Sequence, residues 1–167
     1  NFLKAVAENR TAKELGRLLD NLAKSGSIEE VSSDAANSFK RNWFKGSQWE
    51  PPYKDNSKVL KIKLREDVKL YRVYRENENG DNNMKGAFMI DFDPGQYSST
   101  ELKDMLALGS VPNYYTEITI PKGDSMLVGV TGGNFGGHGG VVQYELLYDT
   151  NEVPARIRYE GRWSLSR

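Results

Sequence analysis

The sequence contains no cysteine and a single histidine, His138, among its 167 residues. The lack of cysteine excludes a disulfide framework and a thiolate zinc site. One imidazole cannot form a multi-histidine metal site, and a Ser-His-Asp hydrolase would have to be built on His138 alone. We therefore expect neither a metal ion nor a resident cofactor.

An excess of charge of one sign is also missing, since 23 lysines and arginines balance 23 aspartates and glutamates. A neutral chain has no overall field that would draw it to nucleic acid, so we expect no nucleic-acid partner. No apolar run approaches the ~20 residues of a membrane span, and no secretion signal opens the chain. The chain starts at Asn1 and not at a methionine, which indicates a fragment of a longer polypeptide.

Helix signals dominate the first part of the chain. The segments TAKE at 11–14 and SIEE at 27–30 each have a Ser or Thr three residues before a Glu, as in a capping box. Leucines at helical spacing follow the first signal, and apolar residues four apart follow the second. We predict helices near 12–24 and 28–44 that form a helical hairpin, with a further short helix around 2–9 as an option.

Beyond a linker that contains Pro51–Pro52, the apolar pattern changes to a period of two. In KVLKIKLRED at 58–67, for example, apolar residues alternate with lysines, which is typical of a half-buried strand. More short strands and one short helix, STELKDMLALG, follow. The sequence therefore predicts an α+β protein. A helical region with its linker occupies 1–57, and a compact, mostly antiparallel β domain with one or two short helices occupies 58–167.

Six glycines surround His138 in GGNFGGHGGVVQYELL, just before a strand-like run. A hairpin needs one or two glycines, so this number favours a cleft where a ligand approaches the backbone, with a flexible surface loop as the alternative. In the run that follows, Tyr144 and Leu146 belong to an apolar face, and Gln143 and Glu145 point to the other face. That second face is either a solvated sheet surface or part of a ligand site. We interpret His138 as a turn residue and not as a catalyst.

Two arginines stand in LYRVYRE, within another predicted strand. Arg72 shares a face with Val68 and Leu70, and an arginine on an apolar face needs an anion or room for its charged end. Its planar guanidinium suits a ligand phosphate, and an internal salt bridge is the alternative. Arg75 lies on the opposite face and is expected to be solvated.

The segment VGVTGGNFGGHGGVVQYELL, preceded by YYTEITIPKGDSM, resembles the tuberculosis necrotizing toxin (TNT) family of NAD(P)+ glycohydrolases. The resemblance covers roughly residues 70–150 and implies a TNT-like fold related to ADP-ribosyltransferases. It implies that Gln143 is essential for cleavage and that Arg72 binds the substrate, with Arg75 as the competing position. It also implies that Phe88, in GAFM, is an aromatic residue of the site.

Other candidate contacts surround these residues. Where the family has a histidine ahead of the glycine loop, this sequence has Tyr114 and Tyr115, and Tyr115 is a candidate substrate contact. Gly136 and Gly137 would let the backbone approach the dinucleotide, and Glu145 is a candidate for stabilising the charge that develops on the ribose. Because the nicotinamide of NAD+ is a cationic leaving group, its departure needs little general acid. A site poor in titratable side chains fits that chemistry.

The resemblance also implies a biological setting. The resemblance implies that the chain is a bacterial toxin domain that depletes NAD+ or NADP+ in the cytoplasm of a target cell. Such a domain is the C-terminal part of a larger secreted or contact-delivered protein, as in contact-dependent growth inhibition by polymorphic toxins, and meets a membrane only during delivery. A cognate immunity protein is the expected partner, and the domain is expected to be a monomer.

Two alternative functions stay open. A mono-ADP-ribosyltransferase would use the same NAD+ and would employ Arg72 and the QYE segment at 143–145. The glutamine and glutamate of that segment, however, lie inside a predicted strand instead of in a turn before it. A non-enzymatic binding module for carbohydrate or protein would use the plentiful tyrosines and tryptophans as stacking surfaces.

Overall fold

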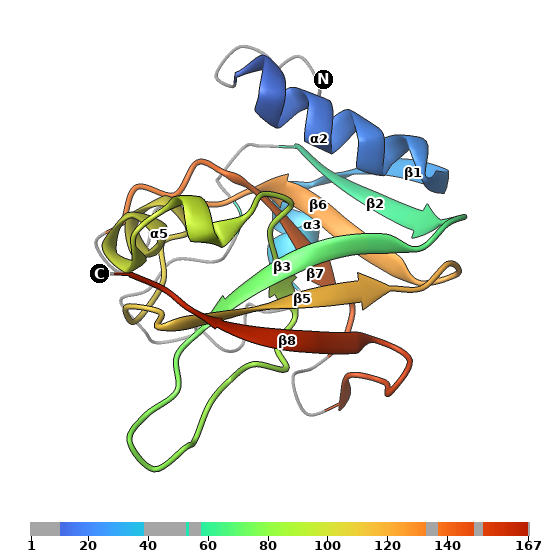
Figure 1. The fold of residues 1–167 in the computed structure, drawn as a ribbon. Coiled ribbons are helices and arrows are strands. Elements are labelled where there is room, and N and C mark those ends of the chain that lie inside the picture. The colour runs from blue at the N-terminus through green and yellow to red at the C-terminus, as the bar shows by residue number, and fades with distance from the viewer. Residues whose placement is uncertain (1–10, 39–52, 54–57, 133–136, 149–151, 167) are drawn as a thin grey trace.

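Helices and two antiparallel sheets make up the described part of the chain, as Figure 1 shows. The computed structural model describes residues 11–38, 53, 58–132, 137–148 and 152–166. None of the helices in these ranges combines the length and the apolar character that crossing a bilayer requires. In chain order the elements are α2 (Ala12–Ala23), β1 (Ser25–Ser32), α3 (Ser33–Ser38), β2 (Lys58–Leu64), β3 (Val68–Tyr74), β4 (Phe88–Met89), a 3-10 helix (Pro94–Gln96), α5 (Ser99–Met105), β5 (Tyr114–Ile120), β6 (Ser125–Val130), β7 (Val142–Leu146) and β8 (Arg158–Ser164).

The larger sheet has the strand order β1-β2-β6-β7-β4, and the smaller sheet has the order β3-β5-β8. Every neighbouring pair is antiparallel. Figure 1 shows the smaller sheet in front of the larger one, with α2 along the top. The predicted α+β class with mostly antiparallel strands is confirmed, although the segment GAFMIDFDP contributes only the two residues of β4.

The main core lies between the two sheets and under α2. Burying one of its large apolar side chains contributes roughly 1.5–3 kcal/mol relative to leaving it exposed. Because α2 packs into this core and β1 pairs along β2, the residues before 38 share both core and sheet with the residues after 58. The division of the chain at residue 57 stays a prediction. Core residues from six elements are Leu18, Leu22, Ile62, Leu70, Ile118, Met126, Tyr144 and Leu146.

The predicted helix at 28–44 is wrong over its first part, so the helical hairpin is not formed there. The segment Ser25–Ser32 is β1, which pairs along the whole of β2, and α3 covers only Ser33–Ser38. A ladder of hydrogen bonds to a strand more than 25 residues away outweighs the local capping signal. The rest of the predicted helix, 39–44, lies outside the described residues, as does the optional helix at 2–9.

Two predicted helices are confirmed. α2 begins after Thr11, whose side-chain oxygen accepts a hydrogen bond from the third amide of the helix at 3.2 Å. α5 begins after Ser98 with a complete capping box. It ends before the predicted stop at Gly109, because the chain turns at Ala107, which adopts a left-handed φ of 50°. This early turn forms one wall of a cavity.

Candidate functional site

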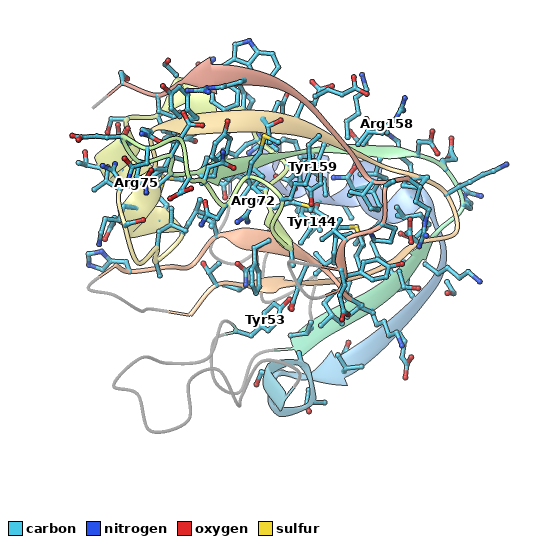
Figure 2. The ribbon with its side chains drawn as sticks, turned by 90° about the horizontal axis from the view of Figure 1, so that it is seen from below. Tyr53, Arg72, Arg75, Tyr144, Arg158 and Tyr159 are labelled. Carbon is cyan, nitrogen blue, oxygen red and sulfur yellow. The ribbon has the colours of Figure 1, made fainter. Side chains whose placement is uncertain are left out.

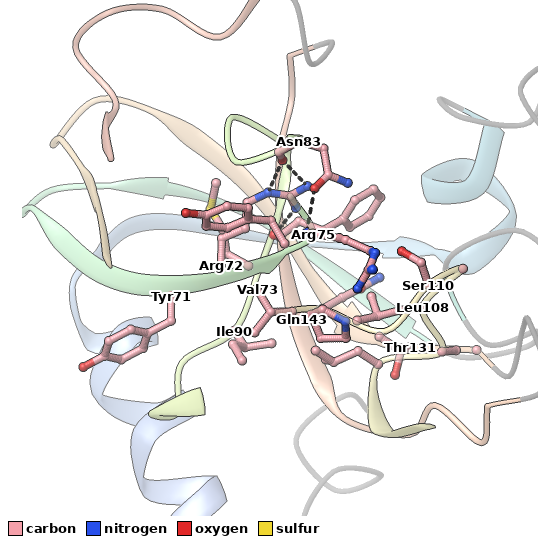
Figure 3. Close-up of a pocket in the computed structure, with 18 residues that line it drawn as sticks. Tyr71, Arg72, Val73, Arg75, Asn83, Ile90, Leu108, Ser110, Thr131 and Gln143 are labelled. Atoms are coloured by element: carbon pink, nitrogen blue, oxygen red, sulfur yellow. Dashed lines mark hydrogen bonds between the residues drawn. The ribbon is translucent and has the colours of Figure 1, made fainter. Parts of the chain in front are cut away.

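A cavity of about 330 Å³ opens between β3 of the smaller sheet and the β4–β7 side of the larger sheet. Its walls come from β3, β4, the turn at 106–112 after α5, and the ends of β6 and β7 (Figure 3). A volume of this size falls in the range of small-molecule sites, which are largely apolar and hold a few polar groups. The cavity brings together polar side chains from distant parts of the chain, among them Arg72, Arg75, Asn83, Ser110 and Gln143.

Gln143 presents a buried amide at this cavity. The residue is 7% exposed and lies on β7 opposite Gly129 of β6. Among the described residues its Nε2 has no hydrogen-bond partner. A buried donor left unpaired costs about 1–3 kcal/mol, so a protein that keeps one has a reason other than stability. An acceptor on a bound ligand would provide the missing partner.

Arg72 is held by backbone carbonyls. Its Nη1 donates to the carbonyl oxygen of Phe88 at 2.8 Å, its Nε to that of Met84 at 3.0 Å, and its Nη2 to that of Asn83 at 3.0 Å (Figure 3). A Cβ on Gly86 would lie 2.1 Å from Nη2, so only a glycine leaves room for the guanidinium. Burial lowers the pKa of Arg72 to about 10, which still leaves it charged at neutral pH.

Carbonyl oxygens thus satisfy Arg72, instead of the salt bridge that the sequence offered as an alternative to a ligand phosphate. The arginine ties the loop between β3 and β4 to β3. It lines the cavity, and its contact with a substrate stays a prediction.

Arg75 is the more accessible of the two cations in the cavity wall. Its side chain is exposed, as expected, and Figure 3 shows it reaching across the cavity toward Ser110 and Gln143. Its Nη1 donates to the carbonyl oxygen of Val111 at 3.1 Å, and its backbone N–H donates to Oδ1 of Asn83 at 3.2 Å. These contacts direct the charged end over the cavity, where an anionic ligand would meet it.

Phe88 also lines the cavity, whereas its strand partner Glu145 does not. Of the two alternatives for this face of β7, the solvated sheet surface is wrong, because Gln143 and Glu145 are 7% and 0% exposed. Tyr53 covers this face. Its hydroxyl donates to Oε1 of Glu145 at 2.7 Å, and a Cβ on Gly129 would lie 2.6 Å from its ring. Burial, and then the charge of Glu145, raise the pKa of Tyr53 well above its usual value.

Tyr115 lies outside the cavity wall. Its ring stacks on Trp163 of β8, with centroids 5.2 Å apart, and meets Tyr71 edge to face at 6.2 Å. The structure therefore gives Tyr115 a packing role on the smaller sheet. The cavity that contains Gln143 does not include Tyr115, the predicted substrate contact.

The glycine loop packs against the end of α5. A Cβ on Gly137 would lie 2.9 Å from both the Cα of Ala107 and the carbonyl oxygen of Asp104. The Nδ1 of His138 lies 2.6 Å from Oδ1 of Asp104, and the His138 side chain is 87% exposed. This hydrogen bond lowers the pKa of Asp104. His138 thus fastens the loop to α5, in keeping with a turn role, while Gly136 lies outside the described residues.

The turn after α5 is the part of the cavity that sequence reasoning missed. The segment at 106–112 supplies one wall, with Ser110 as a hydroxyl and Ala107 in its left-handed conformation. Gly109 and Pro112 are turn signals that indicate a loop here, but no local pattern indicates that the loop faces β7.

Within the described ranges, no three acidic, His or Cys side chains gather as metal ligands would.

Replacing Gly137 with alanine should disturb the contact between the glycine loop and α5. The new Cβ would meet backbone atoms, which cannot move aside as a flexible side chain can. We expect a loss of about 1–3 kcal/mol, seen as a fall in Tm by calorimetry. The control is Gly16→Ala in α2, where a Cβ meets nothing within 4 Å and alanine should raise Tm slightly. An unchanged Tm for Gly137→Ala would show that the loop does not pack there.

Comparison with known proteins supports the fold. The sequence matches no protein-family model and no curated protein. Among solved structures, the chain is similar to a chain in the structure of Tne2 in complex with Tni2, with a TM-score of 0.52 and 16% sequence identity. The match covers 68% of this chain and 98% of that chain. At this identity the likeness shows a shared fold.

Proposed function

We propose that this chain is a toxin domain that hydrolyses NAD+, or NADP+, to nicotinamide and ADP-ribose. One observation carries the proposal. Gln143 from β7, Arg75 and Arg72 from the β3 region and Phe88 from β4 all line one cavity, although up to 71 residues separate them in sequence. These are the residues that the resemblance to the TNT family implies for the site, and the Nε2 of Gln143 lacks a hydrogen-bond partner within the described part of the chain.

The proposed reaction needs little acid or base catalysis from the residues that line the cavity. The bond between the ribose and the cationic nicotinamide breaks, and its electron pair goes to nicotinamide. A positive charge develops on the ribose. Water then adds to the ribose carbon that held nicotinamide and releases a proton. Positioning and electrostatic stabilisation are the main tasks of the protein. The carboxamide of Gln143 can donate to a ribose hydroxyl and accept from the attacking water. Arg75 would pair with the diphosphate.

Transfer of ADP-ribose to a protein is the less favoured reaction. In a mono-ADP-ribosyltransferase, the glutamate of the QYE segment would have to reach the substrate. Glu145 is fully buried, bonded to Tyr53 and absent from the cavity wall. This arrangement favours water over a protein side chain as the acceptor.

The setting that we propose follows from the same resemblance. The chain would be the C-terminal domain of a larger protein that is secreted or delivered by contact, and would act as a monomer in the target-cell cytoplasm. A cognate immunity protein would protect the producing cell. The fold likeness to a chain solved in the complex of Tne2 with Tni2 supports a protein partner of this kind.

The proposal is tested by incubating the purified chain with NAD+ labelled in its adenylate part, with and without cell lysate. We expect equal amounts of nicotinamide and ADP-ribose and no labelled protein band. Labelled bands would mean transfer. Intact NAD+ and intact NADP+ at high protein concentration would overturn the enzymatic proposal and favour a binding module.

Replacing Arg75 with alanine should weaken substrate binding. A lost charge-assisted hydrogen bond to the diphosphate corresponds to a rise in KM of about 10- to 100-fold. The Tm should stay unchanged, because the side chain is exposed. Arg158→Ala is the matched control, since Arg158 is an exposed arginine of β8 outside the cavity wall. An unchanged KM for Arg75→Ala in steady-state kinetics would show that Arg75 does not bind the substrate.

A further inference from the structure

A chain of hydrogen bonds joins α2 to β7, the strand that carries Gln143. The Nδ2 of Asn21 donates to the hydroxyl oxygen of Tyr144 at 3.1 Å, and this hydroxyl donates to Oδ2 of Asp91 at 2.7 Å. The Nε of Arg17 contacts Oδ1 of the same carboxylate at 3.4 Å. Arg17 and Asn21 belong to α2, Tyr144 belongs to β7, and Asp91 follows β4.

These polar groups are buried and depend on one another. Tyr144 is 0% exposed, Asn21 is 8% exposed, and the side chain of Asp91 is 7% exposed. Burial raises the pKa of Asp91, while the bonds from Tyr144 and Arg17 favour its charged form. Burial also raises the pKa of Tyr144, so its hydroxyl stays a neutral donor. A buried carboxylate held in this way fixes the positions of its partners, because a partner that moves leaves a buried polar group without its hydrogen bond.

The anchored residues flank the cavity. Tyr144 directly follows Gln143 and pairs with Met89 of β4, two residues before Asp91. Successive strand residues point to opposite faces, so a fixed Tyr144 on one face sets the position of Gln143 on the other. Figure 2 shows Tyr144 and Tyr53 on opposite sides of the larger sheet. Through Asp91 the same bonds hold the end of β4, which carries Phe88 and Met89 into the cavity.

We infer that Arg17, Asn21, Asp91 and Tyr144 are positioning residues for the Gln143 site, and that α2 is therefore part of the catalytic unit. The inference rests on the proposed function for its kinetic consequence. The geometry of the network itself does not depend on that function. A network of this kind adds little stability over an apolar pair of the same shape, so its use lies in fixing one arrangement of β4 and β7.

Tyr144→Phe removes one hydroxyl and keeps the ring. We expect kcat for NAD+ cleavage to fall about tenfold at a temperature well below Tm, with KM changed less than twofold, since a misplaced amide affects the transition state more than ground-state binding. Arg17→Gln, which keeps a hydrogen-bond donor but loses the charge, should give a smaller fall in kcat.

The matched control is Tyr148→Phe. The hydroxyl of Tyr148 also donates to a buried aspartate, Asp124, at 2.9 Å, but neither residue lines the cavity. Both tyrosine variants should lose stability, and only Tyr144→Phe should lose kcat. Unchanged kcat in Tyr144→Phe, or an equal loss in Tyr148→Phe, would overturn the positioning role.

A second readout does not need NAD+ cleavage. The chain has three glutamines, so the side-chain NH2 signals of Gln143 are identified in a ¹⁵N spectrum as the pair missing from Gln143→Leu. These signals should shift in Tyr144→Phe and stay in place in Tyr148→Phe. If the wild type leaves NAD+ intact and the signals still shift, the proposed function fails and the positioning role stands. Signals that do not move in Tyr144→Phe would overturn the positioning role by itself.

Discussion

Replacing Gln143 with leucine is expected to reduce kcat for NAD+ cleavage by about 100-fold or more, the cost typical of losing a preorganised hydrogen-bond donor. The folded protein should be at least as stable as the wild type. The reason is that the Nε2 of Gln143 is buried and without a partner in the described part of the chain, so leucine removes an unpaired donor costing about 1–3 kcal/mol. Nicotinamide release and chemical denaturation measure the two effects.

The matched control is Gln96→Leu, which makes the same change at an exposed position outside the cavity. It should leave kcat unchanged. Full activity in Gln143→Leu would overturn the assignment of Gln143 to the reaction. A large loss of stability in that variant would mean that the Nε2 of Gln143 makes a hydrogen bond in the folded protein, which would contradict its unpaired state.

Replacing Arg72 with alanine should destabilise the fold by about 3 kcal/mol or more. The carbonyl oxygens of Asn83, Met84 and Phe88 lose their donors together, and a cavity opens beside Gly86. For a chain of this size the loss corresponds to a fall in Tm of roughly 6–12 °C. Arg72→Lys should rescue only part of it, because an ammonium cannot reproduce the planar fork.

Arg75→Ala serves as the comparison for this second experiment, since it removes the neighbouring cation without removing a buried anchor. The two variants show which of the two competing positions, Arg72 or Arg75, binds the substrate. If Arg72→Ala keeps its Tm and raises KM while Arg75→Ala leaves KM unchanged, then Arg72 and not Arg75 binds the diphosphate, and the loop between β3 and β4 does not depend on Arg72 for its stability.

Local sequence patterns predicted those elements whose signals are complete within a few residues. The capping boxes before α2 and α5 and the alternation in β2 are of this kind. β1 was missed because SIEE carries a helix signal, whereas its strand character comes from pairing with β2 across the linker. No local pattern contains that partner, so the helical hairpin was the natural error.

The candidate site was predictable only in part, because its walls come from segments that are distant in sequence. The resemblance named Gln143, Phe88 and Arg72, with Arg75 as the competing position, and all four line one cavity. The burial of Glu145 could not be read from its strand, because the residue that covers it is Tyr53, from the linker. Apolar patterning correctly indicated that Arg72 needs a partner, but that partner is a set of carbonyls in a loop that only the folded chain brings near.

The most direct measurement is a crystal structure of the chain with a non-hydrolysable NAD+ analogue. The dinucleotide should occupy the cavity, with the amide of Gln143 about 3 Å from a hydroxyl of the nicotinamide ribose and Arg75 against the diphosphate. A dinucleotide bound elsewhere, or a nicotinamide ribose out of reach of Gln143, would contradict the proposed site.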